Sequence, residues 1–329
     1  MLSAAMLSRW HVHADDYAKE ALEHPEINIV KIWDEKPERG QAWAEELGVE
    51  FEADLVTVLK NPEIDAVIVD TPTNLHKEVI LEAAEHGKHI FSEKVLTLTS
   101  ADCEEIFEKV KEKKVQLMLS LPRLSDPYYV YAEQVMEEGL IGKLTTIRCR
   151  LAHNGALPTS NNPDGWLPSH FFDKSACGGG ALIDLGAHPI YLSNRLGGSV
   201  KNVSARLQTF LDSEVDDNSI VTIEYENGAL GILEAGFVSE GSFILELHGT
   251  EGIYIVENGN VRLKSCRRTN NQWEDIMDLP PSGRSPMEQW CEAILHGTNP
   301  HITKEDMLLL TRLNEAASLA DQEKRIVSL

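Results

Sequence analysis

The sequence predicts an α/β chain of two domains: a doubly wound parallel sheet, then an α+β domain with a large, open, mainly antiparallel sheet. Three observations support this. Strand and helix patterns alternate over the first third of the 329 residues, which indicates βα units and a parallel sheet. From about residue 144 onward strand patterns dominate. There the dipeptides Asn227-Gly228 and Asn258-Gly259 indicate hairpins, and hence antiparallel pairing. We place the domains at 1–121 and 122–329.

The first domain alternates strands and helices from residue 27 onward. Residues 65–70 form a nearly continuous apolar run, as expected for a parallel strand that is covered on both faces. Gly48 and Gly87 end two of the helices. The expected strands are 27–33, 65–70, 89–93 and 115–119, and the expected helices are 37–47, 75–85 and 100–113.

The second domain opens with a helix after Asp126-Pro127, a capping residue followed by a good first-turn residue. This helix should run to Gly139. The expected strands are 144–151, 200–210, 219–226, 229–236, 243–248 and 252–256, and two late helices are expected at 286–295 and 304–322.

The composition excludes several classes of function. A net charge of −23 argues against nucleic acid and against an anionic membrane surface as partners, because both need a basic footprint. The five cysteines show no zinc-site spacing, which is typical of reduced thiols in an intracellular protein. No apolar run has membrane-spanning length. We therefore expect a soluble, cytoplasmic protein.

A doubly wound sheet binds ligands at the carboxyl ends of its strands, so the first turn is the expected dinucleotide site. No GxGxxG motif is present. Small residues stand at the spacing of its glycines, as Ser3-x-Ala5-x-x-Ser8, ahead of a helix that is expected to begin near Trp10. Main-chain N–H groups there would reach a pyrophosphate. The predicted cofactor contacts in this turn are Ser3, Ala5, Met6, Leu7 and Ser8. The first strand would then be very short, unless residues before Met1 complete it.

Asp34 follows the second strand. A carboxylate at this position accepts hydrogen bonds from an adenosine ribose and repels a 2′-phosphate, which favours NAD over NADP. Lys36 and Arg39 lie close enough in sequence to meet a phosphate, so NADP stays open. A solvated loop aspartate is the alternative interpretation.

Two further strand ends carry polar residues where cofactor and substrate should meet. Thr71, Pro72, Asn74 and His76 follow one strand, and Glu93-Lys94 follows the next. A helix-capping turn would explain the first segment equally well. A cation against an apolar floor, as Lys94 would be, orients a hydroxyl or stabilises a developing alkoxide.

Residues 178–188 read Gly-Gly-Gly-Ala-Leu-Ile-Asp-Leu-Gly-Ala-His. On a helix, the spacing of Asp184 and His188 would place both side chains on one face. A carboxylate beside an imidazole is an acid/base device. The alternative is a glycine-rich turn followed by a core helix with one satisfied histidine.

The segments TPTNLH, GKHIFSEK and GGGALIDLGAHPI, in this order, resemble the glucose–fructose oxidoreductase, inositol dehydrogenase and rhizopine-catabolism family (Gfo/Idh/MocA). The resemblance spans nearly the whole chain. It implies a Rossmann domain, an open-sheet domain, homodimers or homotetramers formed through that sheet, and NAD- or NADP-dependent oxidation or reduction of sugars and cyclitols. Val95 stands where the family has proline, and small residues replace its glycines.

The resemblance also implies residue roles. It places the family's lysine on Lys94, with Glu93 as its acidic companion, and the family's Asp and His on Asp184 and His188. Residues 71–76 match the segment that flanks the nicotinamide. As a hypothesis, His188 takes the hydroxyl proton, Asp184 orients the imidazole, and Lys94 binds the reacting oxygen.

Two alternatives use the same residues or the same fold. One is an NAD-dependent glycosidase or epimerase that works through a transient ketone, and the other is a non-catalytic ligand sensor.

Four residues are predicted to contact substrate in addition to Asp184 and His188. They are Arg123, Tyr128, Trp166 and His170. A domain-junction salt bridge is the alternative for Arg123, and core packing is the alternative for Tyr128. The long loop 154–173 is typical of a lid, and Trp166 suits stacking on a sugar face. Although His11-x-His13 precedes two acids, we predict no metal site.

Overall fold

The computed structural model describes residues 1–160 and 162–329; the predicted loop 154–173 therefore includes one residue, Asn161, that lies outside the described part. The chain divides into two compact units. The first comprises Met1–Leu121 and Arg284–Leu308, and the second comprises Pro122–Gly283 and Leu309–Leu329. Residues 284–308, which the sequence analysis assigned to the second domain, thus belong to the first unit.

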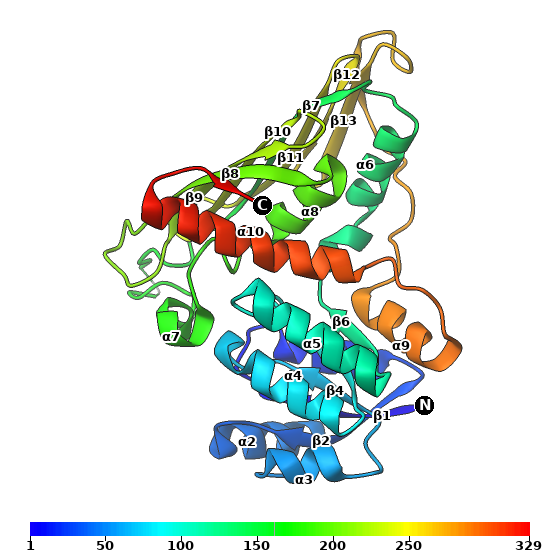
Figure 1. Cartoon of the computed structure of the whole chain (residues 1–329), viewed down its shortest axis with the longest axis vertical. Helices are drawn as coiled ribbons and strands as arrows, with labels where there is room; N and C mark the ends of the chain where they lie inside the picture. The colour runs from blue at the N-terminus through cyan, green and yellow to red at the C-terminus, as the bar shows by residue number, and fades with distance from the viewer. Residues whose placement is uncertain (161) are drawn as a thin grey trace. The chain divides into compact units, whose positions relative to one another are not determined.

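The first unit contains the predicted doubly wound sheet, with six parallel strands in the order β3-β2-β1-β4-β5-β6 (Figure 1). This is the strand order of a Rossmann domain, whose ligands bind where the order reverses. The strands are β1 (Leu2–Leu7), β2 (Ile27–Trp33), β3 (Glu50–Phe51), β4 (Ala66–Val69), β5 (His89–Ser92) and β6 (Leu117–Leu119). The helices are α1 (Ala14–Glu23), α2 (Pro37–Leu47), α3 (Leu55–Lys60), α4 (His76–Glu85), α5 (Ser100–Lys113) and α9 (Pro286–His296).

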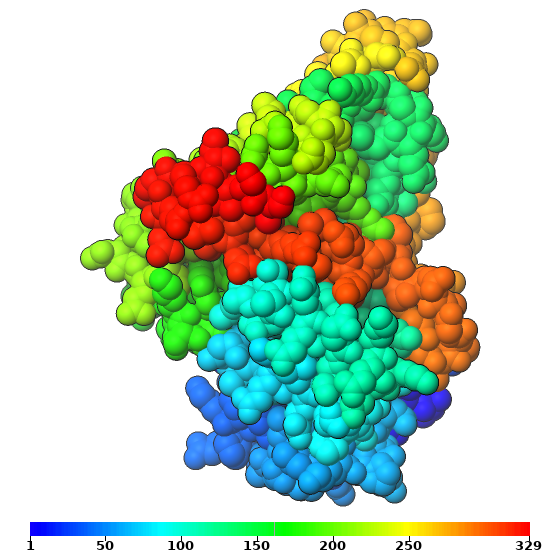
Figure 2. Space-filling model, viewed as in Figure 1, coloured from blue at the N-terminus to red at the C-terminus, as the bar shows by residue number. Residues whose placement is uncertain are grey.

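Helices cover both faces of this sheet. The ring of Phe91 in β5 lies 5.3 Å from that of Tyr17 in α1 and 5.7 Å from that of Trp290 in α9, so α1 and α9 cover one face. On the other face α4 and α5 pack against each other, and they form the cyan surface in Figure 2. This double cover explains why all four residues of β4 are apolar and buried.

The prediction of a very short first strand was wrong. β1 runs from Leu2 to Leu7 and pairs with both β2 and β4. Ser3 and Ala5 therefore lie within the strand, and the turn is formed by residues 8–13. The sequence interpretation failed because Ala5, which was read as a turn residue, is a core residue with no exposed surface.

The second unit contains a nine-stranded sheet in the order β14-β13-β12-β11-β7-β10-β9-β8-β15. Among the described strands of this second sheet, only β10 and β7 pair in parallel; the other pairs in it are antiparallel, as predicted. Both hairpin predictions are confirmed, since Gly228 joins β9 to β10 and Asn258-Gly259 joins β12 to β13. The strands are β7 (Leu144–Ala152), β8 (Val200–Gln208), β9 (Asn218–Tyr225), β10 (Leu230–Gly236), β11 (Ser242–Gly249), β12 (Gly252–Glu257), β13 (Asn260–Ser265), β14 (Trp273–Asp275) and β15 (Val327–Ser328).

One face of this sheet is covered by α6 (Pro127–Glu137) and α8 (Ala187–Gly197), which contact β12, β7 and β10. Ile220, Leu230 and Ile232 on the neighbouring strands β9 and β10 are exposed. The remaining helices are α7 (Lys174–Cys177) and α10 (Lys304–Glu323), with 3-10 turns at Thr73–Leu75, Pro122–Ser125 and Ser169–Phe172. Within the described residues, no helix is both long enough and apolar enough to cross a membrane.

Candidate functional site

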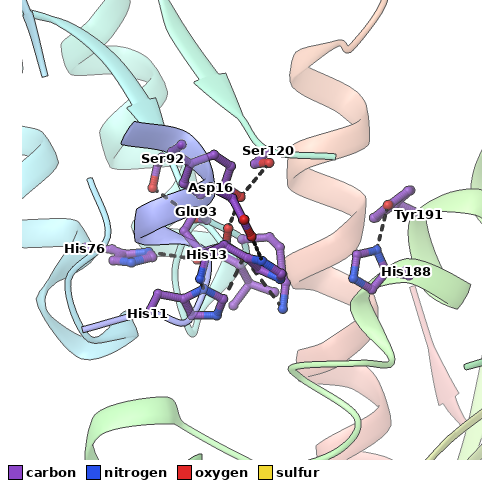
Figure 3. A network of polar contacts seen from close by, with 12 residues as sticks. His11, His13, Asp16, His76, Ser92, Glu93, Ser120, His188 and Tyr191 are labelled. Carbon is purple, nitrogen blue, oxygen red and sulfur yellow. Dashed lines mark hydrogen bonds and ion pairs between the residues drawn. The ribbon is translucent and has the colours of Figure 1, made fainter. Parts of the chain in front are cut away.

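A buried polar cluster surrounds Glu93 at the carboxyl edge of the first sheet (Figure 3). The carboxylate is 1% exposed and accepts a hydrogen bond from the Tyr17 hydroxyl, which also lies 2.8 Å from Ser120 Oγ. His11 Nε2 lies 3.9 Å and Lys94 Nζ 3.7 Å from Glu93 Oε1. Burial, and next the charge of Glu93, raise the pKa of Tyr17 well above its usual range, so the phenol stays a hydrogen-bond donor. The predicted pair Glu93-Lys94 is thus buried among polar partners from three other segments.

His76 is committed to the backbone. Its Nδ1 lies 2.9 Å from the carbonyl oxygen of Val95, and its Nε2 lies 3.1 Å from that of Thr71. Burial lowers the pKa of His76, so the ring is neutral and donates from one nitrogen at a time. The imidazole holds the segment after β4 beside the Lys94–Val95 peptide bond, which is cis.

Asp70 directly follows β4 and was missed by the sequence analysis. Both carboxyl oxygens, and the neighbouring Thr71 Oγ1, are buried without a hydrogen-bond partner among the described residues. Burial, and next the charge of Glu93, raise the pKa of Asp70 well above its usual range. The sequence did carry a signal for Asp70, namely an acidic residue directly after a buried apolar strand. The same signal is the basis for the prediction of Asp34. Of the other residues predicted here, Pro72 is buried and Asn74 is exposed.

The Asp34 carboxylate is already engaged by protein groups. It accepts from Arg39 Nε and Nη2 at 2.8 Å each, from the Arg9 amide at 2.9 Å and from the Lys36 amide at 2.7 Å. Its side chain has no exposed surface. The end of β2 therefore presents a neutralised Asp34–Arg39 pair to a ligand, in place of the open carboxylate that was expected.

Ser8 occupies the sharp bend after β1. Its φ of 80° lies in the region that favours glycine. The hydroxyl accepts from the Trp10 amide at 3.1 Å and from Arg39 Nη2 at 3.0 Å. A serine thus takes the position at which a dinucleotide-binding turn usually has glycine, and its side chain ties the turn to Arg39 of α2.

In the second unit, Asp216 anchors the glycine-rich run. Its carboxylate accepts from the amides of Gly180 at 3.0 Å and Leu182 at 2.8 Å, and its carbonyl accepts from the Ala181 amide at 2.7 Å. A Cβ on Gly180 would lie 1.9 Å from that carbonyl oxygen. This close approach is why glycine is needed there.

Asp184 and His188 do not lie together on one regular helix, contrary to the sequence prediction. α8 begins at Ala187, and residues 181–186 form turns. The acceptors on Asp216 hold the amides of the glycine run in a turn, so regular helix starts only afterwards. Asp184 precedes the helix, and His188 lies in its first turn.

His188 has a partner that sequence reasoning missed. Its Nδ1 lies 2.8 Å from the hydroxyl of Tyr191, one turn further along α8 (Figure 3). Tyr191 is 1% exposed, and its hydroxyl also accepts from the Arg123 amide at 3.3 Å. The spacing of three residues on a helix was the available signal. Tyr191 is thus placed to orient the imidazole, and the orienting role of Asp184 stays a prediction.

Arg123 and Tyr128, predicted to contact substrate, belong to one polar and aromatic cluster. Arg123 Nη1 donates to the Tyr128 hydroxyl at 3.1 Å, and that hydroxyl donates to Asp126 at 2.5 Å. The guanidinium lies 4.9 Å from the ring centroid of Phe243. Substrate contact by these two residues stays a prediction.

Trp166 and His170 lie in the predicted loop. Trp166 is 53% exposed and its ring lies 4.5 Å from that of His153, a residue that the sequence analysis did not consider. His170 is half-buried, and its carbonyl accepts from the Cys177 thiol at 3.2 Å.

The acids beside the two early histidines are paired with protein groups. His13 Nδ1 lies 3.0 Å from Asp16, and Asp15 pairs with Arg9 at 2.9 Å. In the described part of the chain, no group of three or more His, Cys, Asp or Glu side chains is placed to hold a metal ion.

Comparison with known proteins matches both units. Residues 10–121 match the family described as "Oxidoreductase family, NAD-binding Rossmann fold", and residues 129–255 match "GFO/IDH/MocA C-terminal domain". Scyllo-inositol 2-dehydrogenase (NAD(+)) of Bacillus subtilis is 30% identical over 310 residues, which are 89% of this chain and 86% of that protein. Levoglucosan dehydrogenase of Pseudarthrobacter phenanthrenivorans is 30% identical over 257 residues, 69% of this chain and 65% of that protein.

A solved structure shows the same fold. Levoglucosan dehydrogenase in complex with NADH and levoglucosan matches with a TM-score of 0.85 at 24% identity, and the match covers 100% of this chain and 99% of that one.

Proposed function

Because the chain belongs to the Gfo/Idh/MocA family of oxidoreductases, we propose that it transfers a hydride between a nicotinamide cofactor and a hydroxyl- or keto-bearing carbon of a sugar, sugar derivative or cyclitol. The observation that carries the proposal is the buried Glu93-Lys94 pair at the carboxyl edge of the Rossmann sheet. The substrate class is supported by relatives named for inositol and levoglucosan.

The first unit offers a place for the cofactor. The strand order reverses between β1 and β4, and there Asp70 and Thr71 present buried polar atoms without partners among the described residues. Unsatisfied buried groups in a native fold call for a ligand or water. Residues 8–13, Thr71, Pro72 and Asn74 would hold the dinucleotide, and a bound nicotinamide would supply hydride chemistry.

We propose NAD as the preferred cofactor. Arg39 pairs with Asp34 and Glu35, and Arg9 likewise pairs with two carboxylates. Neutralised guanidinium groups attract the 2′-phosphate of NADP poorly. Calorimetric titration should give a lower Kd for NAD⁺ than for NADP⁺.

His188 is proposed as the group that accepts the substrate's hydroxyl proton. When Nδ1 carries the ring proton and donates it to Tyr191, Nε2 has a lone pair for this task. The Asp184 carboxylate would stabilise the imidazolium that results.

Lys94 is proposed to bind the reacting oxygen. Its ammonium group is buried, and a charge-assisted hydrogen bond is stronger there than in water. Glu93 would keep Lys94 charged, because a nearby carboxylate favours the cationic form.

The test is a screen for NAD⁺ and NADP⁺ reduction over sugars, sugar acids and cyclitols. We expect NADH to accumulate with one class of ring polyol, and His188→Ala to lose about 10²–10⁴-fold in kcat with cofactor binding intact. If His188→Ala keeps full turnover, the assignment of the base is wrong; if no polyol reduces either cofactor, the dehydrogenase proposal fails.

A second copy of the chain is proposed to cover the exposed face of the large sheet. Ile220, Leu230 and Ile232 are exposed on the neighbouring strands β9 and β10. An ion pair joins Arg148 of β7 to Glu234 of β10, with 2.7 Å between Arg148 Nε and Glu234 Oε2. A patch with both charges suits the self-complementary contact of a twofold dimer. Light scattering should give a dimer or tetramer, and a monomer would contradict this.

A further inference from the structure

Three rings are packed together where β7 ends. The ring of His153, the first residue after the strand, stacks on Phe237 at 5.3 Å and 15°. The centroid of the Trp166 ring lies 4.5 Å from that of His153, with an angle of 50° between the two ring planes. We call His153, Trp166 and Phe237 the aromatic platform. Phe237 has no exposed surface, so it forms the floor.

The platform is held by the backbone. The Leu167 amide donates to the carbonyl of Gly155 at 2.9 Å, and the Ala156 amide donates to that of Phe237 at 3.0 Å. A Cβ on Gly155 would lie 2.8 Å from the Trp166 ring and 2.9 Å from that of His153. The two rings are therefore fitted against the loop backbone, and Trp166 is an exposed side chain in a fixed place.

The chemistry of His153 suits a polar ligand. Its Nδ1 accepts from the Gly155 amide at 3.0 Å, so the neutral ring carries its proton on Nε2 and donates from there. Burial lowers the pKa of His153, while the Asp184 carboxylate acts in the opposite direction. Phe237 of the platform lies in one buried apolar cluster with Ala181, and Leu185 packs against that cluster, so the platform adjoins the turn that carries Asp184.

We propose that this platform binds the substrate ring, with the apolar C–H face of a pyranose or cyclitol on Trp166 and a ring hydroxyl accepting from His153 Nε2. A saturated polyol ring presents an apolar face and a rim of hydroxyl groups. An exposed indole beside a fixed donor matches both. The inference rests on the proposed function, which it deepens by naming the residues that bind the ring away from the reacting carbon.

The test compares Trp166→Leu and Trp166→Phe with the matched control Trp273→Leu. Trp273 is 46% exposed in the same unit, on β14. Kd is measured calorimetrically for myo-inositol and levoglucosan added to the NADH complex, in which no oxidation can occur. Trp166→Leu should raise Kd about ten- to a hundredfold. Trp166→Phe should raise it less, and Trp273→Leu should not change it.

Kinetics and His153 variants separate binding from chemistry. Trp166→Leu should raise KM for the substrate found in the screen with kcat near the wild-type value. His153→Gln retains an N–H donor and should bind better than His153→Phe. Circular dichroism and unfolding midpoints check that each variant is folded.

The outcomes distinguish the two proposals. If the wild type binds a polyol but forms no NADH, and Trp166→Leu loses the binding, the dehydrogenase proposal is refuted and the platform proposal is supported. Turnover with unchanged Kd and KM in Trp166→Leu would refute the platform alone. If the wild type neither binds nor oxidises any ring polyol, the platform proposal is overturned as well.

Discussion

Replacing Gly180 with alanine should disrupt the turn that precedes Asp184 and His188. The added Cβ would lie 1.9 Å from the carbonyl oxygen of Asp216, whereas carbon and oxygen normally approach to about 3.3 Å. The Asp216 backbone must therefore retreat by more than about 1 Å. Three hydrogen bonds from the run 180–182 to Asp216 depend on its position.

The expected cost follows from these contacts. Three lost hydrogen bonds at about 1 kcal/mol each give about 3 kcal/mol, and overpacking adds about 1 kcal/mol or more. Gly179→Ala is the matched control, because its Cβ would meet Ile183 Cγ2 at 3.2 Å and Asp216 Oδ1 only at 3.9 Å. It should cost less than about 1 kcal/mol.

Urea unfolding and turnover measure the effect. Gly180→Ala should lose stability relative to Gly179→Ala, and its kcat/KM should fall because Asp184 and His188 follow the displaced turn. Equal unfolding free energies for the two variants would refute the claim that the Asp216 carbonyl excludes a side chain at Gly180.

Three other predictions concern single side chains. Tyr191→Phe should lower kcat/KM by less than the ~10²–10⁴-fold loss expected for His188→Ala, because it removes the hydroxyl at Nδ1 but keeps the base; a wild-type pH–rate profile in Tyr191→Phe would contradict this. The raised pKa of Asp70 means that the stability it contributes is fully present below its unfolded pKa and is lost as pH rises through the folded pKa. Asp70→Asn should therefore gain stability relative to the wild type as pH rises, which urea unfolding at several pH values would measure, and a constant difference would count against it. Ser8→Gly should be more stable than Ser8→Ala by about 1 kcal/mol, since both lose the hydroxyl and only glycine relieves the positive φ; equal unfolding midpoints would remove the argument.

Local patterns predicted most of the architecture. The apolar run of β4 and the turn Asn227-Gly228 carry their structural meaning within a few residues, so sheet type and hairpin followed from them. β1 was missed because LSAAML contains small residues that read equally well as a turn or as a tightly packed strand. Only the helices packed on both faces of the sheet decide between the two.

The site depended on contacts that sequence spacing does not reveal. Asp216 anchors Gly180 from 36 residues away, and no local pattern connects them. The ion pair between Asp34 and Arg39 was not predicted, because the sequence shows only that the two residues lie near each other along the chain. His153 was missed because its proposed role depends on stacking with Phe237, which directly follows a different strand, β10.

The central claim is hydride transfer from substrate carbon to nicotinamide, and deuterium transfer tests it most directly. The best polyol from the screen, deuterated at the carbon that becomes the ketone, is incubated with the enzyme and NAD⁺. The account predicts that NMR finds the deuterium in NADH at C4 of the nicotinamide ring, in one-to-one ratio with ketone. Ketone without deuterium in the cofactor, or deuterium returned to the sugar in an epimerised or cleaved product without net NADH, would contradict a dehydrogenase.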